Sequence, residues 1–206
     1  MSKYLNSATQ KFLMLGLKLP TDPRWVHLAE MKLEDILTDH AYCEQKAASS
    51  GISMIQSYPE FEELVDQITP LVSEEWSHFK MVIQELKIRN LRLGRQRKDE
   101  YVNKLRLLIR KSGNRHHRMM DDLLTNALIE ARSCERFRLL SEGLEDESLR
   151  NFYRQFMESE AGHYRMFKDL AEKYCGKEET NKRWLEFLEY EKEILAQLEL
   201  RGDRMH

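Results

Sequence analysis

Two copies of the sequence Glu-x-x-His constrain this chain more than any other feature. They are Glu75-Trp-Ser-His78 and Glu160-Ala-Gly-His163. Residues three positions apart on an α-helix lie on the same face, so each glutamate and its histidine can point at one spot. Both copies stand among good helix formers and contain no proline. Each copy therefore predicts a helix with a polar face that can hold a ligand.

The rest of the chain is predicted to be helical as well. Only 8 Gly and 4 Pro occur in 206 residues, and all four prolines lie in about the first third, so turns are few and elements long. Residues 1–20 are expected to lie against the bundle. Apolar residues recur at helical spacing over about 22–55, 60–93, 115–140, 147–174 and 178–200, with a basic helical segment over 97–111. We expect one all-α domain over 1–206.

The positions of two further glutamates match those of the Glu-x-x-His pairs. In an antiparallel hairpin, residues at equal depth are symmetric about the turn. Glu44 and Glu75 are symmetric about the predicted break at Tyr58-Pro59-Glu60, and Glu130 and Glu160 about the predicted turn at Gly143–Asp146. One glutamate from each of two helices and one Glu-x-x-His from each of two others is the ligand pattern of ferritin-like di-iron bundles. The sequence thus predicts a four-helix bundle of two antiparallel hairpins.

The predicted ligand set favours particular metals. Four carboxylates and two imidazoles (Glu44, Glu75, His78, Glu130, Glu160 and His163) form a mainly hard-oxygen site, which suits iron or manganese better than zinc or copper. Four buried acids would be very costly without a cation. Glu74 and Ser159, each directly before a Glu-x-x-His glutamate, could hydrogen-bond a ligand histidine.

Other residues compete for these roles. Asp39 and Glu135 also fall near the required depth, and Glu135 is the first substitute for Glu130, although its symmetry point lies slightly past the turn. The other histidines have no ligand spacing and are interpreted as surface or ordinary packing residues: His27, His40, His116, His117 and His206.

The charge of the chain is unevenly distributed. The segment from Lys87 to Arg118 contains twelve lysines and arginines against two acids, whereas the whole chain has a formal net charge of -2. Such a cluster attracts phosphates, although a solvated connection between two hairpins would look similar. If the partner is a nucleic acid, the candidate contacts are Arg92, Arg95, Arg97, Lys98 and Arg115.

Four sequence blocks, taken together, resemble a known family. They are Asp39-His-Ala-Tyr-Cys-Glu-Gln-Lys-Ala-Ala48, Glu74-Glu-Trp-Ser-His-Phe79, Ile129-Glu-Ala-Arg-Ser-Cys-Glu-Arg-Phe137 and Glu158-Ser-Glu-Ala-Gly-His-Tyr164. They are similar to the blocks of the tRNA 2-methylthio-N6-isopentenyladenosine hydroxylases, over nearly the whole chain. The Glu-x-x-His pairs alone would indicate only a ferritin-like protein.

The resemblance implies an activity that spacing cannot show. Members of this family hydroxylate the isopentenyl side chain of the hypermodified adenosine at position 37 of tRNA, with O2, an external electron donor and two iron ions. The six predicted ligands would then hold the irons. The alternative is a ferritin- or rubrerythrin-like di-iron oxidase or peroxidase without a nucleic-acid substrate.

The sequence also gives an expectation for the cellular location of the protein. No stretch approaches the roughly 18 apolar residues of a membrane span, and the N-terminal residues lack the pattern of a signal peptide. Three cysteines without paired spacing do not predict disulfides. We therefore expect a cytoplasmic protein, a monomer, without membrane attachment.

Overall fold

The computed structural model describes residues 15–206, and every regular element within that range is helical. The four long helices are α3 (Leu33–Ser57), α4 (Glu62–Ile88), α6 (Arg115–Gly143) and α7 (Glu147–Cys175). The shorter ones are α2 (Arg24–Glu30), α5 (Glu100–Leu105), the 3-10 turn η1 (Arg106–Leu108) and the crossing helix α8 (Lys177–Gln197). The predicted all-α class is confirmed.

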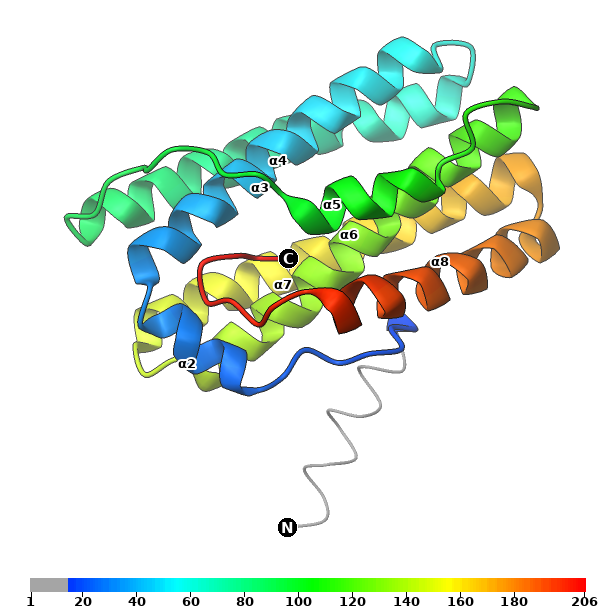
Figure 1. Cartoon of the computed structure of the whole chain (residues 1–206). Helices are drawn as coiled ribbons and strands as arrows, with labels where there is room; N and C mark the ends of the chain where they lie inside the picture. Colours follow the sequence, from blue (N-terminus) through cyan, green and yellow to red (C-terminus); the bar gives the residue numbers. More distant parts are fainter. Residues whose placement is uncertain (1–14) are drawn as a thin grey trace.

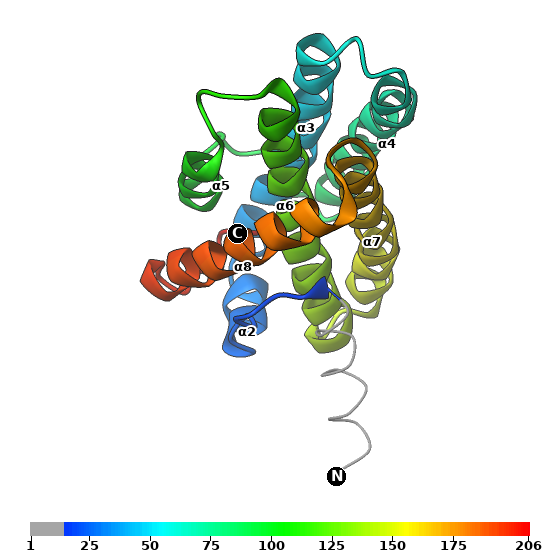
Figure 2. The same cartoon turned by 90° about the vertical axis from the view of Figure 1, so that its right-hand side faces the viewer.

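The long helices form two antiparallel hairpins that pack into one bundle (Figure 1). Helix α3 packs mainly on α4, and α6 mainly on α7. Figure 2, which looks along the bundle, shows α5 and α8 on its outer side beside α6. An extended stretch leads from the end of α4 back to α5 and connects the two hairpins.

Local caps fix both ends of α7. Asp146 begins α7 by accepting hydrogen bonds from the backbone N–H groups of Ser148 and Leu149, which would otherwise lack partners. Gly176 ends the same helix with a φ of 84°, a conformation that glycine adopts at little cost. The turns thus fall where the symmetry of the glutamates requires them.

Two predicted boundaries were wrong for local reasons, and a third element is shorter than predicted. The first predicted helix is interrupted after Glu30, so α2 and α3 are separate. Helix α4 ends at Ile88 rather than near 93, because Asn90 adopts a left-handed conformation with φ 57°. The basic helix predicted over 97–111 begins only at Glu100, where the Asp99 side chain caps it by accepting from the N–H of Val102.

The core consists of two apolar clusters at different depths of the bundle. Leu64, Ile68 and Leu124 are typical of one cluster, and Leu37, Val82 and Phe137 of the other. Along α4, the first cluster ends at Leu71 and the second begins at Val82. A polar layer therefore lies between them. Leu17, from the segment expected to lie against the bundle, belongs to the first cluster, whereas residues 1–14 lie outside the described range.

The second cluster should contribute strongly to stability. Leu37 is fully buried, so Leu37→Ala should reduce the free energy of unfolding by about 2–5 kcal/mol through lost burial and a residual cavity. Urea denaturation followed by circular dichroism measures this. Leu185→Ala on α8 is the matched control, because Leu185 is 58% exposed and should change stability by less than about 0.5 kcal/mol. Equal effects of the two substitutions would contradict the core assignment.

Candidate metal centre

The six side chains singled out by spacing meet in the polar layer. Glu44 comes from α3, Glu75 and His78 from α4, Glu130 from α6, and Glu160 and His163 from α7, and all six are buried. Their oxygen and nitrogen atoms form two groups in which the atoms lie within 4.8 Å of one another. One group contains Glu44, Glu75, His78 and Glu160, and the other contains Glu75, Glu130, Glu160 and His163.

Two glutamates belong to both groups. Glu75 and Glu160 each have two carboxylate oxygens and could therefore bridge two cations. Glu44 and His78 would then complete one coordination sphere, and Glu130 and His163 the other. Each half thus uses one glutamate and one histidine of its own, and the glutamates of the duplicated motif are the two that both halves share.

Unpaired atoms support a pair of metals in this layer. Within the described residues, Glu75 Oε1, His78 Nδ1, Glu160 Oε2 and His163 Nδ1 are buried without a hydrogen-bond partner. His163 Nδ1 lies 2.8 Å from Glu75 Oε1 but is not aligned for a hydrogen bond. An unsatisfied buried polar atom costs about 1–3 kcal/mol, so four of them need a common partner. The residues therefore fit a two-cation site with hard oxygen donors, which favours iron or manganese.

The residues of the cluster also change one another's ionisation. Burial, reinforced by neighbouring carboxylates, raises the pKa of Glu44 and of Glu130 well above the usual range. Burial also opposes ionisation of Glu75, but the nearby histidines outweigh it and lower its pKa to about 2. Burial disfavours charged histidines too, yet adjacent carboxylates raise the pKa of His78 to about 10 and of His163 to about 11. Metal binding would therefore have to displace protons from these ligands.

Outside the ligand layer, one carboxylate approaches both histidines. Glu74 Oε2 lies 3.4 Å from His163 Nε2, and Glu74 Oε1 lies 3.8 Å from His78 Nε2. Ser159 donates a hydrogen bond of 2.6 Å to Glu74 Oε1. The Nε2 atoms thus face this polar pair while the Nδ1 atoms face the site, which is the orientation that a carboxylate partner imposes on ligand histidines.

His40 was interpreted as a surface or packing residue, and the structure gives it an additional contact. Its ring is fully buried against Phe137, Tyr153 and Phe156, with centroid distances of 4.7, 5.6 and 4.7 Å. Its Nε2 lies 2.8 Å from Glu44 Oε1. The available signal was its position one helical turn before Glu44.

His206 is also held inside the protein. Together with Cys43 and Asp99 it forms a third group at metal-binding distances. Lys46, however, forms an ion pair with Asp99, and the His206 Nε2 atom lies 2.9 Å from the Ser133 hydroxyl. Burial raises the pKa of the Cys43 thiol well above its usual range. Because Lys46 already neutralises Asp99 and the imidazole contacts Ser133, we assign no metal to this group.

Glu135, the substitute candidate, points away from the layer. Its carboxylate accepts hydrogen bonds from the N–H and the hydroxyl of Thr21, at 2.9 and 2.7 Å, and forms an ion pair with Arg132. Arg132 is fully buried and also pairs with Glu191 on α8, at 2.6 Å. Glu135 therefore balances a buried arginine, and Glu130 is the glutamate of α6 that reaches the ligand cluster.

The candidate nucleic-acid contacts divide into two kinds. Arg97 is held between Asp35, at 2.9 Å, and Asp203, at 3.2 Å, and Arg115 pairs with Glu60. Arg92, Arg95 and Lys98 are exposed, and their side chains make no hydrogen bond or ion pair within the described residues. The latter three are therefore the better placed for phosphate contacts.

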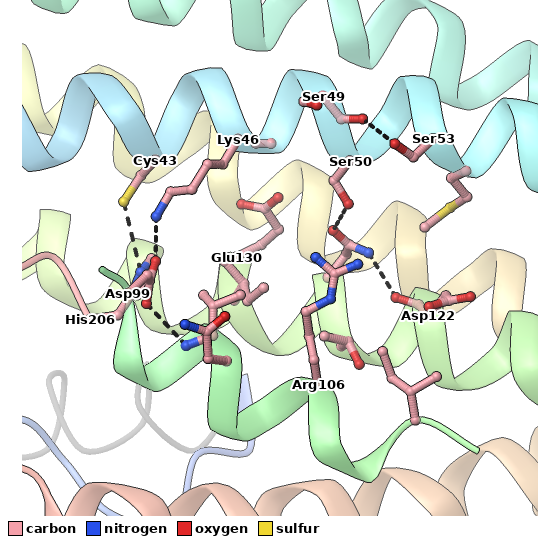
Figure 3. Close-up of a pocket in the computed structure, with 18 of the residues that line it drawn as sticks. Cys43, Lys46, Ser49, Ser50, Ser53, Asp99, Arg106, Asp122, Glu130 and His206 are labelled. Carbon is pink, nitrogen blue, oxygen red and sulfur yellow. Dashed lines mark hydrogen bonds and ion pairs between the residues drawn. The ribbon is translucent and has the colours of Figure 1, made fainter. Parts of the chain in front are cut away.

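A cavity of about 650 Å³ connects the basic segment with the ligand layer. It lies between α3 and α6 beneath the connection that carries α5, and Glu130 forms part of its wall (Figure 3). Arg97, Lys98 and Arg106 line it on the side of the connection. Its size suits a small-molecule group, because such pockets measure about 300–1,000 Å³.

A four-helix bundle with two glutamate–histidine pairs and two shared glutamates is the architecture of ferritin-like di-metal proteins. The sequence model of the tRNA-(ms2io6A)-hydroxylase (MiaE) family matches residues 7–206. The chain belongs to this family.

Individual relatives agree with this assignment. The chain is 37% identical to the tRNA 2-(methylsulfanyl)-N(6)-isopentenyladenosine(37) hydroxylase of Pseudomonas putida over 75% of the chain and 74% of the relative. It is 27% identical to the hydroxylase of the same name from Salmonella typhimurium, over 91% and 85%. A solved structure from Synechococcus, described as Protein 43 with aldehyde deformylating oxygenase activity, superposes with a TM-score of 0.87 at 34% identity, covering 92% and 94%. This similarity confirms the ferritin-like fold.

The two candidate glutamates of α6 should behave differently when substituted. Glu130→Gln should lose tight binding of one of the two metal ions, because it removes a ligand charge. Glu135→Gln should keep the metal content and instead lower the free energy of unfolding by up to about 3 kcal/mol, because Arg132 loses a buried partner. Metal analysis and urea denaturation of both variants measure this. Metal loss in Glu135→Gln alone would reverse the assignment.

Proposed function

We propose that this protein hydroxylates the isopentenyl side chain of 2-methylthio-N6-isopentenyladenosine at position 37 of tRNA. The observation that carries the proposal is the cavity that runs from the basic segment to Glu130, in a chain of the hydroxylase family. Two iron ions, held by the six ligand residues, would supply the activation of O2, with electrons from an external donor. Iron is preferred over manganese because of the family.

The chain's own residues contribute position and exclusion of water. Glu75 and Glu160 would each bind both cations. The aromatic residues around His40 and His78 close the layer on the side of the second apolar cluster. Phe156 lies 4.8 Å from the ring of His78 and 4.7 Å from that of His40. The cavity supplies the opposite, open side, where the prenyl group would meet Glu130.

The competing class is a ferritin- or rubrerythrin-like di-iron protein without nucleic acid. The donor set alone would suit either class. Two features favour the tRNA substrate: the unpaired cations on the connection, and a cavity wall that includes Lys98 and Arg106. No described helix is long and apolar enough to cross a membrane.

Direct turnover tests the function. The iron-loaded protein should convert tRNA carrying the methylthio-isopentenyl adenosine, in the presence of reductant and O2, to a nucleoside heavier by a single oxygen atom. Nucleoside mass spectrometry measures the product. Glu160→Ala is the control without activity, because it removes a ligand shared by both metal groups. Metal-loaded protein that consumes O2 but leaves the nucleoside unchanged would support the competing class.

The exposed cations should control binding of tRNA. Arg95→Ala combined with Lys98→Ala should weaken binding and reduce the slope of log K against log[salt] by about 2, because each lost phosphate contact contributes about 1. Filter binding over a range of salt concentrations measures this. The charge-matched control is Lys80→Ala combined with Arg165→Ala on the exposed surfaces of α4 and α7. If both double variants bind equally well, the connection is not the tRNA contact.

A further inference from the structure

The cavity wall on α6 presents polar side chains at regular intervals. Asp122, Asn126 and Glu130 follow one another every four residues, and all three line the cavity. Four residues of α-helix rise about 6 Å, so successive members lie about one turn apart. Ser50, from the facing helix α3, donates a hydrogen bond of 3.1 Å to Asn126 Oδ1 (Figure 3). The two side chains meet one turn from Glu130.

The amide of Asn126 is only partly used by the protein. Its Oδ1 accepts from Ser50, and its Nδ2 donates to the backbone carbonyl of Asp122 at 2.8 Å. A carboxamide has two N–H donors and two acceptor lone pairs. Within the described residues, one donor and one acceptor of the fixed amide are therefore left for a molecule in the cavity.

An N6-alkylated adenine offers the complementary pair. Alkylation leaves one N6–H as a donor, and the neighbouring ring nitrogen N7 is an acceptor. Asparagine is the side chain whose amide pairs with these two atoms of adenine simultaneously. Gln96 and Asn103 also line the cavity, but they come from the connection rather than from the helix that carries Glu130.

The spacing of Asn126 and Glu130 along α6 matches the length of the prenyl group. The extended chain from N6 to a terminal carbon of an isopentenyl group spans about 5 Å, given bonds of about 1.5 Å. One turn of α6 covers a similar length, about 6 Å. When the adenine pairs with Asn126 and its prenyl group extends along α6, the end of that group reaches the level of Glu130. Ala47 and Ile129, which are apolar, line the cavity as well and suit such a group.

We propose that Asn126, oriented by Ser50, binds N6–H and N7 of the adenine and thereby sets how far the prenyl group reaches toward Glu130. This inference rests on the proposed function and adds a substrate-positioning residue to it. Asp122 is less suited to the same role, because its carboxylate already accepts from the hydroxyl of Tyr58 at 2.5 Å.

The test combines variants with a substrate analogue. With an anticodon stem-loop RNA carrying the natural nucleoside, Asn126→Ala should lower kcat/KM about 10- to 100-fold, because it removes a bidentate contact. Iron content and thermal stability should stay near those of the unsubstituted protein. The 7-deaza analogue, which lacks the N7 acceptor, should slow the unsubstituted protein but should slow Asn126→Ala little further. Such non-additivity indicates a direct contact, because independent effects would multiply.

Further variants separate the possible outcomes. Ser50→Ala leaves the amide in place without its orienting hydroxyl and should show a smaller loss of kcat/KM. Asn151→Ala, at an exposed position of α7, is the matched control and should be unaffected. If the unsubstituted protein produces no hydroxylated nucleoside, the proposed function fails. If the unsubstituted protein does produce it, two results would overturn only the role of Asn126. One is that Asn126→Ala has the same kcat/KM as the unsubstituted protein, and the other is that the analogue and the variant act independently.

Discussion

Four glutamates, one from each long helix, are buried within reach of one another in the middle of the bundle. Mutual repulsion and loss of hydration would oppose this arrangement in a protein without cations. The two apolar clusters above and below the layer provide the packing that holds the helices together in spite of it. The unpaired nitrogen and oxygen atoms in the layer then have one common explanation, a pair of metal ions.

The cost of burying charged groups also shapes the surroundings of the layer. Two charged groups outside the ligand set are balanced by partners: Glu74 lies between the outer nitrogens of the two histidines, and Arg132 pairs with Glu135 and Glu191. On the side of α3 and α6, by contrast, the wall is open to a cavity. The cavity gives a substrate a route by which to approach Glu130.

The ferritin-like fold by itself does not define the reaction. The Synechococcus structure shares the architecture at 34% identity, yet it is described by an aldehyde deformylating oxygenase activity. Because a fold can host several chemistries, the difference between such proteins must lie in the site and in what reaches it. In the present chain the approach passes the basic connection and the Ser50–Asn126 pair, features that suit a nucleic-acid substrate with a modified adenine.

The sequence by itself determined the helices, the two hairpins and the six residues that meet in the layer. Helical periodicity and the symmetry of Glu44, Glu75, Glu130 and Glu160 about two turns are local or nearly local properties, so they can be deduced without coordinates. The matching depth of the acids follows from antiparallel pairing alone.

Only the tertiary structure decided the remaining questions. Glu135 lies five residues after Glu130 at a similar depth, and its role became clear only from contacts with Thr21 and Arg132. The basic connection is extended before Asp99, where Arg97 reaches Asp35 and Asp203 in distant parts of the chain. The aromatic surroundings of His40 and the cavity likewise depend on how separate helices pack. Contacts between residues far apart in sequence leave no periodic signal, which is why these features could not be predicted.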